Sequence, residues 1–235
     1  MRIESSSSTS VVARTNVIWP SASARILRRT QLEDYAAERI AVHKGRHLVV
    51  EGGKSSSVFF QLTGWSAAEC VSQRGERVLM DFLTAGDFIG LADEGPYAAY
   101  TVTTLTDLAV LRIERVQIHA LIEHNSAFRE VYIEALQVML ARAHLRRQAL
   151  SAKSGVAKVC QVLSELSDRV ESAGDNMAGV SRPRLPITQV LLACAVGLTP
   201  VAVNRIVQNL RQAGIVDWGV SGLSVIDVDR LRGFA

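Results

Sequence analysis

Hydrogen-bonding side chains gather near the end of the chain in a pattern that suits base recognition. Asn204, Arg205 and Gln208 lie among apolar residues, which are Val203, Ile206, Val207 and Leu210. Because the apolar residues recur at helical spacing, the polar side chains fall largely on the outer face of a helix. Amide and guanidinium groups can bond base edges in a major groove, and arginine can bond O6 and N7 of guanine together. The chemistry that this pattern favours is recognition of double-stranded DNA.

The residues just before this helix would position it. Thr188 can cap a first short helix, and Gly197 tolerates the positive φ at which that helix would stop. Thr199 can cap the second helix, with Pro200 at its first position, where the missing N–H costs nothing. Two short helices joined by a glycine turn predict a helix-turn-helix, although an ordinary helical hairpin has the same spacing.

The neighbouring segments extend this prediction. Val216–Trp218 and Leu223–Val228 flank two glycines and predict the two strands of a wing. The first helix of the pair, Val190–Val196, is almost wholly apolar. Deep packing beneath the wing and a surface for another protein both explain that composition.

The first half of the chain has the character of an all-β unit. Gly53, Gly64, Gly75 and Gly86 recur at intervals of 11 residues between short β-branched and aromatic runs. Such spacing favours a sandwich or barrel. The runs that we predict as strands are Ile40–His43, His47–Val50, Val58–Leu62, Trp65–Val71, Val78–Phe82, Tyr100–Thr104 and Leu108–Ile113. A short helix is expected before them, over Arg25–Tyr35.

A long helix is predicted between the two halves. Arg115–Ala149 contains no glycine or proline, and Asn125 or Ser126 can cap its longer part. Near-heptad spacing predicts a dimer interface, and packing of one amphipathic helix on its own domain is the alternative. The predicted interface residues are Val131, Ala135, Val138, Arg142 and Leu145. Ser151–Gly155 is then predicted to be a hinge, and Val156–Val170 is predicted to form a further amphipathic helix.

Several motifs together resemble a known family. Ile187–Gln189, Val196–Thr199, Val203–Arg205 and Leu210–Ile215 resemble the DNA-binding domain of the Crp/Fnr family of bacterial transcription regulators. The resemblance extends more weakly to about residue 39, and Gly86–Gly90 is similar to the glycine-rich turn of the family's sensor.

The resemblance implies an α+β chain. Its parts would be an N-terminal double-stranded β-roll (jelly-roll-like), a long dimerisation helix and a C-terminal winged helix-turn-helix. The corresponding boundaries are a flexible arm over 1–24, the cyclic-nucleotide-binding-like sensor over 25–122, the dimerisation helix over 123–150 and the DNA-binding domain over 151–235.

The resemblance also assigns DNA contacts. The positions that read bases are Pro200, Val201, Asn204 and Arg205, with Thr199 and Gln208 on phosphates. Arg205 matches the family's recognition arginine. Pro200 and Val201 stand where the best-known members have arginine and glutamate, and neither can bond a base through its side chain. The half-site of those members is therefore not expected here.

The sensor departs from the family pattern for cyclic nucleotides. Members that bind them use a glutamate for the ribose and an arginine for the phosphate. Leu91 stands at the glutamate position, and no Lys or Arg occurs between Arg77 and Arg112. A buried phosphate would lack a counter-charge, so we expect cyclic AMP not to bind. The effector pocket would involve Gly90, Leu91, Ala99 and Tyr100.

No cofactor, metal site or enzymatic activity is predicted. The three cysteines are far apart, no C-x-x-C occurs, and neither a P-loop nor G-x-S-x-G is present. Because some relatives sense gases through haem, haem ligation by one of the histidines or by Cys70 stays an alternative to solvated or packed histidines.

Bulk properties bound the partners. A net charge of +3 permits nucleic-acid binding without requiring it. No apolar run is long enough to cross a bilayer and no signal-peptide core occurs, so we expect a cytoplasmic protein with no membrane partner. The expected partners are a palindromic duplex and a second copy of the chain, with RNA polymerase or another protein as a further candidate. The alternatives are a winged-helix protein-interaction module and a small-molecule receptor with only secondary DNA binding.

Overall fold

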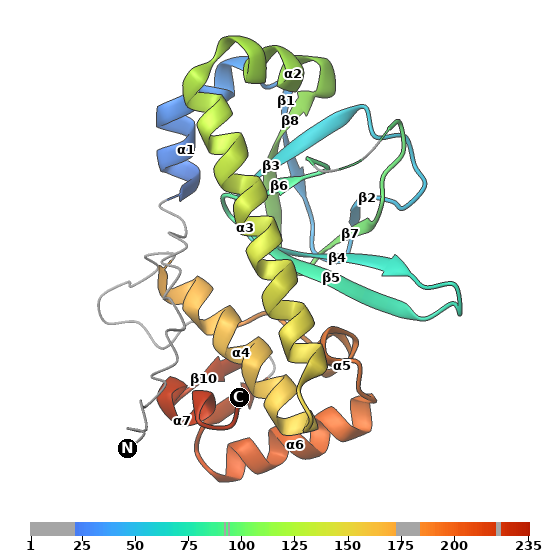
Figure 1. Cartoon of the computed structure of the whole chain (residues 1–235), viewed down its shortest axis with the longest axis vertical. Coiled ribbons are helices and arrows are strands. Elements are labelled where there is room, and N and C mark those ends of the chain that lie inside the picture. The colour runs from blue at the N-terminus through green and yellow to red at the C-terminus, as the bar shows by residue number, and fades with distance from the viewer. Residues whose placement is uncertain (1–21, 92, 94, 173–183, 220–221) are drawn as a thin grey trace, which may run out of the picture.

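The computed structural model describes residues 22–91, 93, 95–172, 184–219 and 222–235. A β-sheet domain and a C-terminal helical domain are joined by one long helix, α3 (Ser126–Ser151), which runs along the side of the β-sheet domain (Figure 1). The predicted order of β-roll, long helix and winged helix-turn-helix is confirmed. The predicted arm lies outside the described residues up to residue 21, and its expected end at residue 24 falls inside α1 (Ala22–Thr30).

Within the described residues, the β-sheet domain consists of two four-stranded sheets with antiparallel pairing. Their strand orders are β1-β8-β3-β6 and β2-β7-β4-β5. The strands are β1 (Glu38–Val42), β2 (His47–Val49), β3 (Ser57–Thr63), β4 (Trp65–Val71), β5 (Arg77–Thr84), β6 (Phe88–Ile89), β7 (Thr101–Thr104) and β8 (Leu108–Glu114). Each predicted run overlaps one of these strands, with ends that differ by at most two residues. The additional strand, β6, lies inside the glycine-rich turn and is too short to show a period of its own.

Apolar side chains from the first sheet and from the helices form one core. Phe60, Phe88 and Phe128 are buried in it, with ring centroids 4.8 Å apart for the first pair and 6.3 Å apart for the second. These distances fit the tilted and edge-to-face arrangements that aromatic rings prefer. Phe128 belongs to α3, so this core attaches the first half of the long helix to the β-roll.

Two predicted helices are each divided by one residue. The expected helix over 25–35 is α1 followed by a 3-10 turn, η1 (Leu32–Tyr35), because Gln31 between them adopts a φ of +52°. The expected helix over 115–149 is α2 (Arg115–His124) followed by α3. Asn125 is extended between them, and its side-chain oxygen accepts from the Phe128 N–H at 2.9 Å. A capping side chain thus competes with helix continuation. The expected boundary at 122/123 therefore falls inside α2.

The C-terminal domain has the predicted helices and wing strands, but the predicted strand Leu223–Val228 ends at Val225 and Val228 begins a further short helix. The elements are α4 (Gly155–Ser172), α5 (Gln189–Val196), α6 (Pro200–Gln212), β9 (Val216–Gly219), β10 (Gly222–Val225) and α7 (Val228–Arg232). The two strands pair in antiparallel register and form the wing. Among the described residues, no single helix is long and apolar enough to span a membrane, and only the pair α5 and α6, bent by 106°, passes that test jointly.

Candidate functional site

The helix-turn-helix has the local geometry that its capping residues predict. The Thr188 hydroxyl accepts from the Leu191 N–H at 3.1 Å, and the Thr199 hydroxyl accepts from the Ala202 N–H at 3.2 Å. Gly197 ends α5 at a φ of +64°, and Pro200 opens α6. These contacts satisfy backbone donors at both helix starts. They set the direction in which α6 leaves the turn.

The outer face of α6 is open to solvent. Val203, Val207 and Leu210 are buried, whereas all six residues predicted to contact DNA are exposed. A shallow surface groove is lined by Gln189, Pro200, Val201, Asn204, Arg205, Gln208 and Asn209. Gln189 and Asn209 are additions to the predicted set. Asn204 donates to the Gln189 side-chain oxygen at 2.8 Å, which joins the two helices across this face.

The apolar first helix, α5, is buried rather than available. Leu191, Leu192, Ala193, Ala195 and Val196 are each less than a tenth exposed. They pack in a core that also includes Leu79 and Phe82 of β5. Among the described residues of α5, Val190 is the only large apolar residue that is exposed, and 54% of its surface is accessible. Packing between the two domains therefore accounts for most of this composition.

The residues of the long helix that are predicted to form the dimer interface differ in exposure. Val131 and Arg142 are only 2% and 5% exposed, so their side chains contact their own chain and not a partner. Ala135 and Val138 are half-buried beside α1, and Leu145 is exposed. The predicted spacing therefore includes two residues, Val131 and Arg142, of the stripe that packs on the β-roll. The solvent-facing apolar side chains of the first part of α3 are instead Ile133 and Leu140.

The four predicted effector-pocket residues lie close together around β6 and β7. The Gly90 N–H donates to the Tyr100 hydroxyl at 3.1 Å, and Leu91 is buried in the aromatic core. Ala99 is exposed, and its N–H points to the Asp93 carboxylate at 3.4 Å. Asp93 is the central residue of this site, and the sequence pattern does not single it out.

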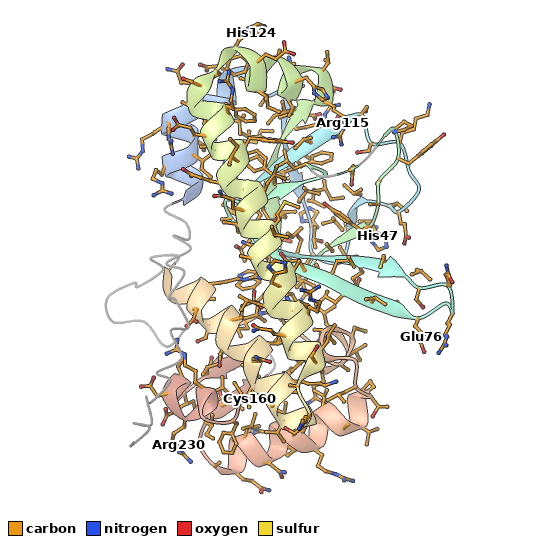
Figure 2. All side chains as sticks on the ribbon, in the orientation of Figure 1. His47, Glu76, Arg115, His124, Cys160 and Arg230 are labelled. Carbon is orange, nitrogen blue, oxygen red and sulfur yellow. The ribbon has the colours of Figure 1, made fainter. Side chains whose placement is uncertain are left out.

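One expectation about this pocket is wrong. A cation is present, because Arg115 donates to the Gly90 carbonyl at 2.8 Å and lies 3.7 Å from Asp93. Arg115 is the first residue of α2 and lies just beyond Arg112, where the stretch without Lys or Arg ends. Figure 2 shows it at the end of the β-roll farthest from the C-terminal domain.

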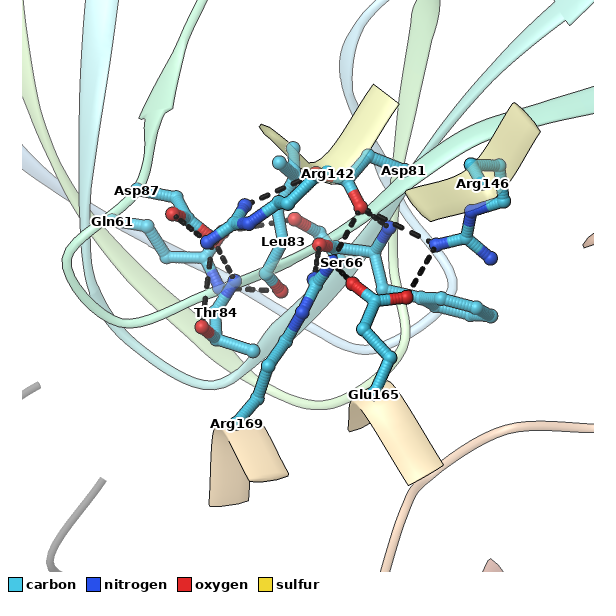
Figure 3. A network of polar contacts seen from close by, with 11 residues as sticks. Gln61, Ser66, Asp81, Leu83, Thr84, Asp87, Arg142, Arg146, Glu165 and Arg169 are labelled. Atoms are coloured by element: carbon cyan, nitrogen blue, oxygen red, sulfur yellow. Dashed lines mark hydrogen bonds and ion pairs between the residues drawn. The ribbon is translucent and has the colours of Figure 1, made fainter. Parts of the chain in front are cut away.

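Six charged residues, four of them buried, meet where the two domains and the long helix join (Figure 3). They are Asp81 and Asp87 from the β-roll, Arg142 and Arg146 from α3, and Glu165 and Arg169 from α4. Asp81 is the hub of this network: it accepts from Arg142 and Arg169 at 3.0 Å each, and from Arg146 at 3.4 Å. Three carboxylates thus face three guanidinium groups.

The charges in this network shift one another's protonation. Burial by itself would raise the pKa of Asp81, but the charges of Arg169, Arg142 and Arg146 outweigh it and lower the pKa to about 2. Burial raises the pKa of Asp87, and the charge of Arg142 opposes that change. The three guanidinium groups therefore keep Asp81 charged at neutral pH. Arg169 also donates to the Phe82 carbonyl at 2.5 Å, which ties α4 to β5 through the backbone.

The histidines and cysteines show no comparable grouping. In the described part of the chain, no set of three or more His, Cys, Asp or Glu side chains could hold a metal ion. His43 is highly exposed and lies 3.6 Å from Asp107. Burial raises the pKa of the Cys160 thiol to about 11.

Two family models match this arrangement. A model described as a cyclic nucleotide-binding domain matches residues 39–125, and one described as a Crp-like helix-turn-helix domain matches residues 157–234. The chain belongs to the Crp/Fnr family. Crp/Fnr proteins of this architecture are transcription regulators, and the helix-turn-helix of this chain is the α5–α6 pair.

Similar proteins within the Crp/Fnr family share the fold at low identity. Electron transport regulator A of Shewanella oneidensis is 21% identical over 202 residues, covering 85% of this chain and 78% of that protein. The structure of FixK2 from Bradyrhizobium japonicum superposes with a TM-score of 0.72 at 19% identity, over 84% of this chain and 96% of that one. The structure of a CooA mutant from Carboxydothermus hydrogenoformans superposes with a TM-score of 0.69 at 15% identity, over 92% of this chain and 97% of that one.

Proposed function

We propose that this Crp/Fnr protein is a homodimeric, sequence-specific DNA-binding regulator that acts without cyclic AMP. The observation that carries the proposal is the exposed row of Asn204, Arg205 and Gln208 on α6, whose opposite face is buried. A helix held in this way can enter a major groove without losing packing in its own domain.

Base reading depends most on Arg205. It is exposed near the start of α6, next to the neutral Val201 and Asn204. A guanidinium that bonds a guanine in two places contributes about 1–3 kcal/mol of discrimination. The test is selection of random duplexes by the purified protein at physiological salt, followed by sequencing. We expect a palindromic motif, with half-sites roughly 34–36 Å apart.

Two arginine variants separate base reading from charge. Arg205→Ala should weaken binding to the selected duplex by roughly 5- to 150-fold and relax one position of the motif. Arg211→Ala removes the same charge from the far end of α6, and should lower affinity for all duplexes similarly. If both variants keep the motif and lose affinity equally, Arg205 does not read a base. If the wild-type protein enriches no sequence, the proposal of specific DNA recognition fails.

The homodimer would form through the free face of α3. Ile133 and Leu140 are 48% and 58% exposed and lie one heptad apart, whereas Leu136 between them is half-buried against the core of its own chain. This is the spacing of a two-stranded coiled coil. Burying such side chains against a second copy would remove exposed apolar surface from water.

Two leucines on α3 distinguish the possible seams. Leu140 belongs to the free face, whereas Leu145 is exposed at 43% and belongs to the stripe predicted from sequence. We expect Leu140→Glu to produce monomers in analytical ultracentrifugation, and Leu145→Glu to leave the dimer intact. The reverse result would place the seam on the other face, and a monomeric wild-type protein would refute the homodimer.

Independence from cyclic AMP is tested directly by thermal unfolding. A ligand that binds only the folded protein raises the melting temperature as its concentration passes Kd. We expect cyclic AMP to leave it unchanged, and a saturable increase would refute this part of the proposal.

A further inference from the structure

The β-roll contains a polar site in which Ser55, Ala99 and Arg115 surround the Asp93 carboxylate, and we call this site the cradle. The Asp93 side chain is only 2% exposed, although it is a carboxylate. One of its oxygens accepts from the Ser55 hydroxyl at 2.7 Å and lies 3.7 Å from the Arg115 guanidinium, and the other accepts from the Ala99 N–H at 3.4 Å. Two hydrogen-bond donors and one cation, from separate segments of the chain, therefore surround one anion.

Arg115 is held in place independently of Asp93. Its Nε donates to the Ser55 carbonyl at 3.0 Å, and one terminal nitrogen donates to the Ser55 hydroxyl and to the Gly90 carbonyl at 2.8 Å each. The Ser55 hydroxyl thus accepts from Arg115 and donates to Asp93. A guanidinium fixed by several hydrogen bonds is well suited to bind an oxyanion.

Backbone geometry keeps room for the carboxylate. Gly90 has a φ of +79°, and a Cβ there would lie 3.2 Å from the nearer oxygen of Asp93. The Ser55 N–H is bonded to the Pro96 carbonyl at 2.8 Å, which draws the segment after Asp93 towards the cradle. The loop between β6 and β7 is therefore attached to the roll at both sides of the anion.

An external anion cannot be added to this arrangement at low cost. A second negative charge beside Asp93 would share the single guanidinium of Arg115, and a buried charge without a partner is expensive. The same donors become available once the Asp93 carboxylate is removed. Truncation of aspartate to alanine deletes one carboxylate group, which is the size of formate.

We propose that this cradle is a carboxylate-binding site whose resident ligand is the chain's own Asp93. The β-roll thereby carries a built-in effector, and the site accepts an external carboxylate only when Asp93 is absent. This inference does not depend on what α6 binds, because the cradle lies at the far end of the β-roll (Figure 2).

The test is chemical rescue of Asp93→Ala by formate, measured by thermal unfolding. We expect the variant to melt below the wild type, and sodium formate to raise its melting temperature relative to sodium chloride at equal ionic strength. At ten times Kd the increase should be roughly 3–6 °C. Formate should not raise the melting temperature of the wild type, whose cradle is occupied.

Two control variants test whether stabilisation by formate arises at the cradle. Asp107→Ala removes an exposed carboxylate that accepts from the Lys44 N–H, and formate should not stabilise it. Addition of Arg115→Met to Asp93→Ala should abolish the response to formate. If formate stabilises Asp107→Ala or the double variant as much as Asp93→Ala, the cradle does not bind it and the proposal is overturned.

A second substitution covers the case in which Asp93→Ala does not fold. Asp93→Asn keeps the size of the side chain but removes the charge that Arg115 faces. It should melt below the wild type and show no response to formate, because the space stays filled. A melting temperature equal to that of the wild type would show that Arg115 does not need an anion, which would also overturn the proposal.

Discussion

Arg169→Met tests whether the buried charge network holds the two domains together. Arg169 comes from α4, and its side chain is 2% exposed. It bonds Asp81 and the Phe82 carbonyl of β5, and it pairs with Glu165 on its own helix. Methionine keeps most of the apolar stem and removes the charge. Two guanidinium groups would then face three carboxylates.

The expected effect is large because the remaining carboxylate charge is buried. Removing one partner of a buried ion pair lowers the free energy of unfolding by about 3–5 kcal/mol. For a chain of this length that corresponds to a fall in melting temperature of about 10 °C. Urea unfolding, followed by circular dichroism, measures the free energy directly.

A neighbouring ion pair provides the control. Arg232 pairs with Asp168 at 2.6 Å, and both side chains are about half exposed. Because exposed pairs contribute about 0–1 kcal/mol, Arg232→Met should change stability little. Combining Arg169→Met with Asp81→Asn restores the balance of charge and should cost less than the sum of the single variants. If Arg169→Met and Arg232→Met are equally stable, the reasoning from buried charge is refuted.

Three further predictions concern single groups. The pKa of Asp81 is about 2 in the folded protein and 3.8 ordinarily, so its ionised carboxylate stabilises the fold fully above about pH 4 and loses this effect as the pH falls towards 2. The difference in unfolding free energy between the wild type and Asp81→Asn should therefore shrink by about 2 kcal/mol over that range. Gly64→Ala should destabilise far more than Gly197→Ala in urea unfolding, because a Cβ at Gly64 would lie 2.3 Å from the Asp107 carbonyl oxygen, whereas at Gly197 only the φ of +64° is unfavourable; equal losses would contradict this. Cys160 is fully buried and its pKa is raised to about 11, so mass spectrometry should find it unalkylated by iodoacetamide at pH 8 until the protein unfolds.

Local sequence signals were sufficient for the helix-turn-helix. Thr188, Gly197, Thr199 and Pro200 act on backbone groups a few residues away, so their roles follow from spacing alone. The strands of the β-roll were also predictable, because turns with glycine bound short runs with β propensity. The same rules explain the capping of α3 by Asn125, one of the two residues that the pattern offered.

Periodicity could not show which apolar face of α3 meets which neighbour. A stripe that packs on the β-roll and a stripe that faces solvent have the same helical repeat. The sequence indicated the first stripe as a dimer seam. Only the packing of the chain shows that Val131 and Arg142 are buried and that Leu140 faces solvent.

The sequence by itself determined the elements, their order and the residues on the outer face of α6, since these depend on neighbours close along the chain. The tertiary structure alone decided the two charged sites. Asp81 and Arg169 are 88 residues apart, and Ser55 and Arg115 are 60 apart. No local pattern links such residues, because the attraction between buried charges depends on distance in space and on exclusion of water, and both arise only when the sheets and helices pack.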